Sequence, residues 1–301
     1  MLNELDWTTM THNGGKVPRL VCVQAEFVDG WYPIYRHPVD APAPPTHELS
    51  TSVRLLKASL ESATNQKFNH VLIQQYRSGE DCISQHADKT LDLVPGSKIV
   101  NVSLGAMRYM SLKKKRDSLR ARSASSSTLP KRKINFHPKN AISRPPAPNQ
   151  RIALEHNSIF VLGAHTNKLW THQIKPDKRS RAQKSPAELA FDGFRVSLTF
   201  RSVATFVTNS SGGGGGGGGG GNSSSGRPQL IYGRGATAKD RVHASPVLYS
   251  DSASESEREN ARAQAKKLLG AFAAENRLGE SFDWQRAYGQ GFDIVDFPTD
   301  L

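Results

Sequence analysis

The stretch "RVSLTFR" (residues 195–201) has the alternating pattern of a β-strand whose two faces meet different surroundings. One face carries Val196, Leu198 and Phe200, and the other carries Arg195, Ser197, Thr199 and Arg201. The apolar face suits a protein core, but burying even one arginine on the opposite face is costly unless the charge is paired. Guanidinium binds carboxylate bidentately, so a dicarboxylate cosubstrate would be a suitable partner. The stretch predicts a core strand with an anion-binding face.

Other short segments rich in Val, Ile and Leu extend this pattern over the first two thirds of the chain. They lie at residues 19–25, 69–76, 98–105, 151–156 and 158–163, and each has the length of a strand. One helix is expected within residues 46–66, with Ser50 or Ser52 as its cap and Val53, Leu56 and Leu60 on one face. Many strands with few helices predict a mostly β fold with flanking helices, either a sandwich or a barrel.

The composition indicates an anionic partner. The 301 residues carry a formal net charge of +13, which suits nucleic acid, anionic lipid or an acidic protein. The two cysteines, Cys22 and Cys82, are too few for a disulfide framework and favour a reducing compartment. No apolar run approaches the roughly 20 residues that span a membrane. We therefore expect an intracellular, soluble protein with no membrane partner.

Three segments do not fit the strand pattern. Residues 113–133 hold nine basic residues and one acid among serines and prolines, which predicts a loosely held insertion, at 113–150 in all. A shorter basic loop follows at 175–184. Residues 209–226 contain ten consecutive glycines and are expected to form a flexible linker. These segments divide the chain into a domain at 1–208, a linker and an extension at 227–301.

The extension is expected to hold one helix, within residues 254–279. Ala261, Ala265, Leu268 and Phe272 form its apolar stripe, and Gly279 is placed to end it. About 75 residues with a single helix seldom form an independent core, so the extension should dock onto the domain or onto a partner. Its sequence offers no chemistry, and we expect that cutting the chain after about residue 211 leaves turnover intact.

The segment "SQHADKT" (84–90) holds a candidate pair of metal ligands. In a strand His86 and Asp88 would project from one face and could bind the same ion. The pair alone is a weak signal. A third ligand is offered further along, because "TNKLWTHQI" (166–174) supplies His172 shortly before the arginine strand. Two histidines and one carboxylate leave open positions on iron, as O2 chemistry requires.

With these residues in view, the chain resembles the AlkB-like 2-oxoglutarate and Fe(II)-dependent dioxygenases. The resemblance covers about residues 17–204. Its landmarks occur in the family's order: "KVPRL" (16–20), "NHVLIQQY" (69–76), "HAD" (86–88), "VSLGAMR" (102–108), "TNKLWTH" (166–172) and "RVSLTFR". It implies a double-stranded β-helix, or jelly roll, with the metal at its open end.

The resemblance also implies the roles of individual residues. His86, Asp88 and His172 match the ligands of Fe(II), and Arg195 matches the residue that holds the distal carboxylate of 2-oxoglutarate. Tyr76 matches a tyrosine that hydrogen-bonds this cosubstrate, Arg201 matches a second arginine of the pocket, and Gln74 stands where the family often has asparagine. The implied reaction consumes O2 and releases succinate and CO2.

Other histidines were weighed against His172. His156 lies in an expected hairpin turn and His165 just before "TNKLW", and neither precedes the arginine strand in the matching register. His37, His70 and His137 are interpreted as surface or packing residues, and Trp170 as a core residue or a wall of the site. The triad His86, Asp88 and His172 is therefore our prediction.

The substrate is the least determined part of this interpretation. The basic loops and the aromatics Trp31, Tyr32 and Tyr35, in the region of the family's nucleotide-binding lid, favour an oxidative demethylase or repair enzyme for alkylated bases of DNA or RNA. Lys89 and Thr90, however, follow "HAD" where repair members usually carry acids. The alternatives are a hydroxylase of a protein side chain or small molecule, and a non-catalytic binding module. We expect a monomer, in the nucleus rather than the cytoplasm.

Overall fold

The computed structural model describes residues 2–12, 14–39, 43–115, 149–209, 228–249 and 254–297. Strands dominate these residues and helices are few, as the sequence predicts. All six strands expected from the apolar segments are present. No described helix is long and apolar enough to cross a membrane.

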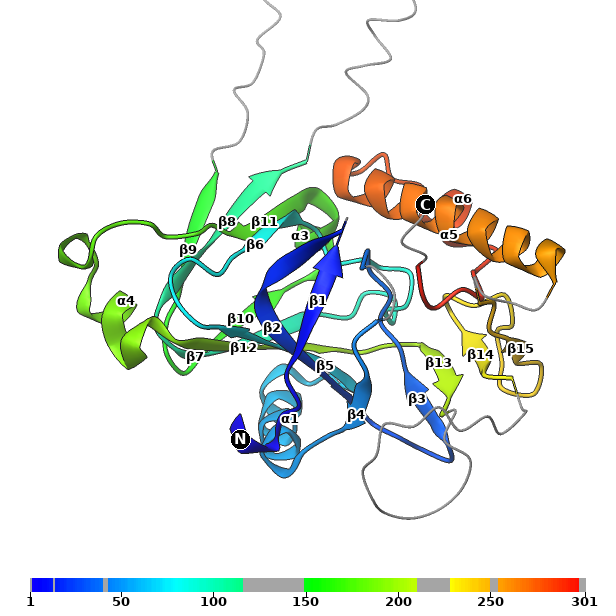
Figure 1. The fold of residues 1–301 in the computed structure, drawn as a ribbon, viewed down its shortest axis with the longest axis horizontal. Helices are drawn as coiled ribbons and strands as arrows, with labels where there is room; N and C mark the ends of the chain where they lie inside the picture. The colour runs from blue at the N-terminus through cyan, green and yellow to red at the C-terminus, as the bar shows by residue number, and fades with distance from the viewer. Residues whose placement is uncertain are drawn as a thin grey trace, which may run out of the picture.

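A seven-stranded sheet forms the larger layer of the fold (Figure 1). Its hydrogen-bonded order is β1 (Thr8–His12), β2 (Gly15–Ala25), β5 (His70–Tyr76), β12 (Arg195–Arg201), β7 (Ile99–Gly105) and β10 (Ser158–Leu162), and β4 (Thr46–Glu48) pairs with β2. The arginine strand β12 lies between β5 and β7, so both of its edges are paired and its alternation is fixed.

A four-stranded sheet forms the second layer. Its order is β6 (Ile83–His86), β11 (Trp170–Ile174), β8 (Arg108–Lys114) and β9 (Gln150–Leu154), and every pair is antiparallel. Short helical segments connect the two sheets. Helix α3 (Ala164–Leu169) lies between β10 and β11, and η2 (Arg181–Gln183), α4 (Pro186–Leu189) and η3 (Ala190–Gly193) lie between β11 and β12. Another, η1 (Leu2–Glu4), opens the chain.

Helix α1 (Thr51–Thr64) covers the outer face of the larger sheet. Val53 and Leu60 are buried, and Leu56 packs against the same cluster, where Val196, Leu198 and Phe200 of β12 also lie. The apolar face of the arginine strand therefore faces α1, as predicted. The helix begins at Thr51 with Ser50 as its N-cap residue, one of the two caps predicted. The preceding residues Thr46–Glu48 pair with β2 as strand β4.

The two ends of the predicted insertion at 113–150 belong to the folded domain. Lys113 and Lys114 continue β8, Lys115 is buried, and Gln150 already belongs to β9. These residues are strand and core rather than a basic loop. Residues 116–148, which carry most of the insertion, lie outside the described residues, as do 210–227 of the predicted linker.

The extension packs against the rest of the chain. Strand β14 (Leu230–Gly233) pairs with β13 (Thr205–Thr208) in a third sheet of order β15 (Ser245–Pro246), β14, β13 and β3 (Trp31–Pro33). Helix α5 (Glu255–Arg277) follows, and α6 (Trp284–Tyr288) packs beside it (Figure 1). The predicted stripe of α5 is buried in a cluster that includes Leu91 of the domain. The helix ends at Arg277, two residues before the expected Gly279.

A buried ion pair joins three distant parts of the chain. The side chains of Arg36 and Asp92 are 2% and 0% exposed, and Arg36 Nη2 lies 2.6 Å from Asp92 Oδ1. Arg36 Nη1 also donates to the carbonyl oxygens of Phe292 (2.7 Å) and Ile294 (3.0 Å). One guanidinium therefore links the segment after β3, the segment that follows "HAD" and the end of the extension.

Replacing Arg36 should strongly destabilise the fold. Arg36→Ala leaves Asp92 buried without its partner, and such a loss lowers the free energy of unfolding by about 3–5 kcal/mol. Arg54→Ala is the matched control, because Arg54 pairs with Glu48 at the surface. Its cost should stay below about 1 kcal/mol. Urea unfolding of the full chain measures the loss of unfolding free energy in each variant. Equal losses in the two variants would contradict the claim that the Arg36 ion pair holds the three segments together.

Candidate functional site

The three candidate metal ligands converge at the junction of β6 and β11. His86 ends β6, and His172 of β11 is its cross-strand partner. Asp88 Oδ1 lies 3.7 Å from His86 Nε2 and 3.8 Å from His172 Nε2. One ligand atom of each residue lies within 4.8 Å of the others, and this is the one such group of three or more found among the described residues. The donor set, two imidazoles and a carboxylate, suits a divalent transition metal.

Asp88 reaches this position differently from the prediction. Strand β6 stops at His86, so strand alternation does not place the carboxylate. Instead the Asp88 N–H donates to Asn167 Oδ1 (3.0 Å), and Asn167 Nδ2 donates back to the Asp88 carbonyl (2.9 Å). Its carboxylate Oδ2 accepts from Arg201 Nη2 (2.8 Å) and Nε (3.1 Å). Side chains from α3 and β12 thus aim the free oxygen toward the histidines.

The electrostatics keep all three groups in the states that metal binding requires. Burial lowers the pKa of His86 to about 3, with the neighbouring His172 acting in the same direction. Burial likewise lowers the pKa of His172. For Asp88, burial alone would raise the pKa, but Arg201 and the two histidines outweigh it and hold the pKa below its usual value. Near neutral pH the site therefore presents two neutral imidazoles and one carboxylate.

The rival histidines lie elsewhere. His156 Nδ1 accepts a hydrogen bond from the Gly105 N–H, and its ring stacks on Phe191. His165 is exposed on α3. His37 stacks on Tyr35, and His70 is buried at the start of β5, while His137 lies outside the described residues. None of the four described rivals belongs to the three-residue group.

A cavity between the two main sheets connects the triad with the predicted cosubstrate residues. Tyr76, Gln74 and Arg201 line it together with His86, Asp88 and His172. Much of the remaining wall is apolar, from Leu72, Ile83, Met110, Phe160 and Ile174. Such a lining excludes water from the space beside the metal-type residues, and a few polar groups are left to orient a ligand.

Arg195 carries an uncompensated buried charge. Its side chain is fully buried, and its Nη2 donates to Ser103 Oγ at 2.9 Å. Its Nε and Nη1 have no hydrogen-bond partner among the described residues. Burial lowers the pKa of Arg195 to about 10, so the group remains charged near neutral pH. The guanidinium lies 5.0 Å from the ring of Tyr76, its cross-strand partner. A buried guanidinium with two donors of this kind is suited to pairing with an anion.

Gly105 makes this arrangement possible. It ends β7 opposite Arg195 with φ +97°, a conformation that favours glycine. A Cβ atom there would lie 2.3 Å from the carbonyl oxygen of Phe194. The glycine of "VSLGAMR" is thus required by the close approach of β7 to the start of the arginine strand.

Gln74 and Arg201 are more engaged than predicted. With its amide oxygen turned toward Arg19, Gln74 accepts from Arg19 Nε at 2.8 Å. Arg201 is paired with Asp88, and its guanidinium lies 4.0 Å from the ring of Tyr35. Only Nη1 of Arg201 has no partner among the described residues. The two arginines on one strand face therefore differ, since one is paired internally and the other is not.

Two asparagines beside the site were not singled out from the sequence. Asn167 holds the backbone of Asp88, and Asn101 donates to Ser197 Oγ (2.7 Å) and Thr199 Oγ1 (3.0 Å) on the polar face of β12. Asn167 stood inside the quoted motif "TNKLWTH", and Asn101 stood inside the apolar segment 98–105. For Asn101 the available signal was an amide in a largely apolar strand, because a buried amide is retained only where its hydrogen bonds are made.

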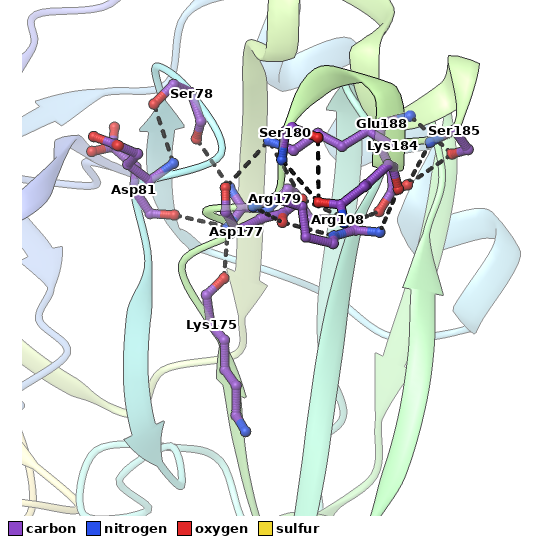
Figure 2. Close-up of polar contacts among 12 residues, drawn as sticks. Ser78, Asp81, Arg108, Lys175, Asp177, Arg179, Ser180, Lys184, Ser185 and Glu188 are labelled. Carbon is purple, nitrogen blue, oxygen red and sulfur yellow. Dashed lines mark hydrogen bonds and ion pairs between the residues drawn. The ribbon is translucent and has the colours of Figure 1, made fainter.

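The basic loop at 175–184 is more folded than its composition predicts (Figure 2). Arg179 pairs with Asp177 and Glu188, and Lys184 Nζ lies 3.6 Å from Asp177 Oδ2. Arg108 fixes the loop base by donating to the carbonyl oxygens of Ser78, Asp81 and Lys175. Two of the positive charges are thus neutralised within the loop region, which weakens its case as a phosphate-binding element.

The three candidate lid aromatics lie in different places. Tyr35 adjoins the site, because its hydroxyl accepts from the Lys89 N–H at 2.7 Å and its ring faces Arg201. Tyr32 stacks on Phe27, and Trp31 packs edge-on against Tyr232 of the extension. Trp170 packs against the cluster of Tyr76 and Met110, as a core residue would. Only Tyr35 therefore contacts the loop of Asp88 directly.

Comparisons with known proteins agree with this geometry. The profile of the 2OG-Fe(II) oxygenase superfamily matches residues 1–201. The human "DNA oxidative demethylase ALKBH2" is 32% identical over 153 residues, 49% of this chain and 44% of that protein. Its Arabidopsis thaliana counterpart is 28% identical over 50% of this chain and 42% of that protein. The human "Alpha-ketoglutarate-dependent dioxygenase alkB homolog 3" is 25% identical over 50% of this chain and 42% of that protein. The chain thus matches less than half the length of these AlkB-like relatives.

Proposed function

This chain belongs to the 2OG-Fe(II) oxygenase superfamily, and from that premise we propose that it is an Fe(II)- and 2-oxoglutarate-dependent dioxygenase that removes alkyl groups from bases of DNA or RNA. The convergence of His86, Asp88 and His172, together with a fully buried arginine that has no acidic partner among the described residues, carries the proposal. Burying an unpaired charge costs free energy, and a bound ligand that pairs with these groups would offset that cost.

His86 Nε2, Asp88 Oδ1 and His172 Nε2 would hold the Fe(II) ion. The donor atoms fit, since two neutral imidazoles and one carboxylate leave positions open for the cosubstrate and for O2. Arg201 would keep the second carboxylate oxygen of Asp88 occupied, so that one oxygen faces the ion. An outer partner of this kind orients a ligand and tunes its basicity.

The 2-oxoglutarate would be held mainly by Arg195. The Nε and Nη1 atoms, which have no partner among the described residues, offer two donors to its distal carboxylate. Tyr76, the cross-strand partner of Arg195, lines the cavity and adds a hydroxyl. Gln74 and Arg201 line the cavity and would complete the cosubstrate site. When bound, the metal and cosubstrate supply the activation of O2, with succinate and CO2 as products. The chain's own task is to orient the bound groups and exclude water.

The architecture is proposed to be a double-stranded β-helix. The two main sheets enclose the cavity, and the metal-type residues lie where β6 and β11 end their pairing. In this proposal residues 1–208 carry the site, 209–226 connect, and 227–301 form the extension.

A nucleic-acid substrate is supported by the names of the relatives and by the net charge of +13. A nuclear location and a monomeric state would accord with this use. The second candidate, hydroxylation of a protein side chain or small molecule, is favoured by one observation. Lys89 and Thr90 follow Asp88, and neither supplies the acid that the resemblance associates with alkylated bases.

Formaldehyde release from methylated oligonucleotides tests the substrate. We expect the full chain with Fe(II), ascorbate and 2-oxoglutarate to release formaldehyde from single- or double-stranded DNA or RNA carrying N-methylated bases. Hydroxylation of an N-methyl carbon gives an N-hydroxymethyl group, whose C–N bond breaks to leave N–H and formaldehyde. Unmodified oligonucleotides and a His172→Ala variant are the controls. Turnover of 2-oxoglutarate without formaldehyde from any oligonucleotide would favour the second candidate.

The metal role of His172 is tested separately. His172→Ala removes one of three donors, so conversion of 2-oxoglutarate to succinate should fall below detection, and metal affinity should fall by at least about 100-fold. His165→Ala is the matched control, since His165 is exposed on the neighbouring helix α3. Succinate formation and direct metal titration measure the two effects. Normal turnover in His172→Ala would mean that the third ligand lies elsewhere.

Arg195 should act through 2-oxoglutarate rather than through the metal. Losing one side of a buried, hydrogen-bonded charge pair costs about 2–5 kcal/mol, so Arg195→Ala should raise the KM for 2-oxoglutarate by roughly 30-fold or more. Metal affinity should be unchanged, because no proposed ligand contacts Arg195. The exposed Arg181 provides the control Arg181→Ala. An unchanged KM in Arg195→Ala would transfer the role to Arg201.

A further inference from the structure

The loop that carries Asp88 has an unusual pattern of backbone hydrogen bonds. Residues 87–90 form no strand, and the first three are buried. Each of their four consecutive N–H groups donates to a side chain from another part of the fold. The acceptors are Asn276 for Ala87, Asn167 for Asp88, the Tyr35 hydroxyl for Lys89, and Glu275 for Thr90. Side chains therefore replace the strand ladder that would otherwise satisfy these groups.

Two of the four acceptors belong to helix α5 of the extension. Asn276 Oδ1 accepts from the Ala87 N–H at 2.9 Å, and Ala87 is the residue between the two ligands His86 and Asp88. The same oxygen accepts from Lys89 Nζ. The Asn276 amide oxygen thus binds the peptide N–H of Ala87, which lies between the two candidate ligands, and also the side chain of Lys89, which follows them.

Glu275 extends this contact along the loop. Its carboxylate accepts from the Thr90 N–H at 3.1 Å and from the Thr90 hydroxyl, and Tyr288 donates its hydroxyl to it at 2.7 Å. Its main-chain carbonyl accepts from Lys115 Nζ at 2.8 Å. Glu275 is only 4% exposed, and the donors to its carboxylate are neutral groups. The carboxylate therefore acts as a fixed acceptor rather than as a surface charge.

Helix α5 is held firmly enough to serve as a template for the loop. Its seam of Ala261, Ala265, Leu268 and Phe272 is completely buried. Leu91, the residue after Thr90, lies in the same apolar cluster. The turn of α5 that carries Glu275 and Asn276 is therefore held by the same cluster that holds the loop, as a group that orients a metal ligand requires.

We propose that Asn276 is a positioning residue for the metal site, which makes the extension a component of that site. This inference rests on the proposed function, in which His86 and Asp88 bind Fe(II). Because β6 ends at His86, no strand geometry fixes the step from His86 to Asp88, and the bond from Ala87 to Asn276 takes that role. This inference differs from our expectation that the extension can be removed without effect on turnover. That expectation was based only on the flexibility of the glycine tract.

The test compares full-length variants at one position. Asn276→Ala removes the acceptor, whereas Asn276→Asp keeps an oxygen at the same place. Lys266→Ala, an exposed residue of the same helix, is the matched control. The dissociation constant for Mn(II), an air-stable substitute for Fe(II), is measured by calorimetry. The visible spectrum of the Co(II)-loaded protein reports the coordination geometry, and the KM for 2-oxoglutarate is measured with Fe(II).

We expect Asn276→Ala to raise the Mn(II) dissociation constant by about 10- to 100-fold, the usual effect of losing an outer partner of a metal ligand, and to alter the Co(II) spectrum. For Asn276→Asp and Lys266→Ala, the Mn(II) dissociation constant should stay within about threefold of that of the parent chain. The KM for 2-oxoglutarate, measured at saturating metal, should change little in all three, because Asn276 contacts none of the proposed cosubstrate residues.

Two results would overturn the inference while leaving the proposed function intact. One is a folded Asn276→Ala variant with parental Mn(II) affinity and Co(II) spectrum. The other is an Asn276→Asp variant as weak as Asn276→Ala, because the acceptor oxygen would then not be the cause. Should Asn276→Ala fail to fold, parental affinity in Asn276→Asp supports the inference and weakened affinity overturns it. If the parent chain binds no Mn(II) at all, the proposed metal site is wrong, and the inference that rests on it is wrong as well.

Discussion

A buried backbone N–H group must find an acceptor, and this constraint organises the structure around residues 87–90. Strand β6 ends at His86, so the residues that carry Asp88 toward His86 and His172 have no ladder partner for their N–H groups. The loop then needs acceptors from outside, and it receives them from the segment after β3, from α3 and from α5. The candidate site is consequently a meeting point of segments distant in sequence.

Local patterns were enough to predict the framework of the fold. Alternation located β12 and its two faces, and short apolar runs located the other core strands, because side-chain direction in a strand depends only on neighbouring residues. The triad needed the ordered motifs of a family, since nothing local connects His86 with His172. The loop at 175–184 shows the limit of composition. Its basic residues were visible, and so were Asp177 and Glu188, but their pairing depends on the folded path of the loop.

Partners contributed by α5 could not be predicted from the sequence, although one signal was present. The seam of α5 advances by steps of four, three and four residues, and the next step of three after Phe272 reaches Glu275. A charged residue on an apolar seam indicates a buried partner, yet the sequence does not say which segment supplies it. The domain's answering groups are backbone N–H groups, which carry no sequence signature at all.

The separation between Ala87 and Asn276 along the chain is 189 residues. Ribosomes add about 5–20 residues per second, so Asn276 is made roughly 10–40 s after Ala87. The strands of both main sheets are complete once Arg201 has been made, but the loop between His86 and Asp88 still lacks two of its four acceptors until Asn276 follows. If that loop binds iron as proposed, the nascent chain cannot hold the ion firmly. Redox-active metal would then bind more tightly after Asn276 has been made than it does to the growing chain.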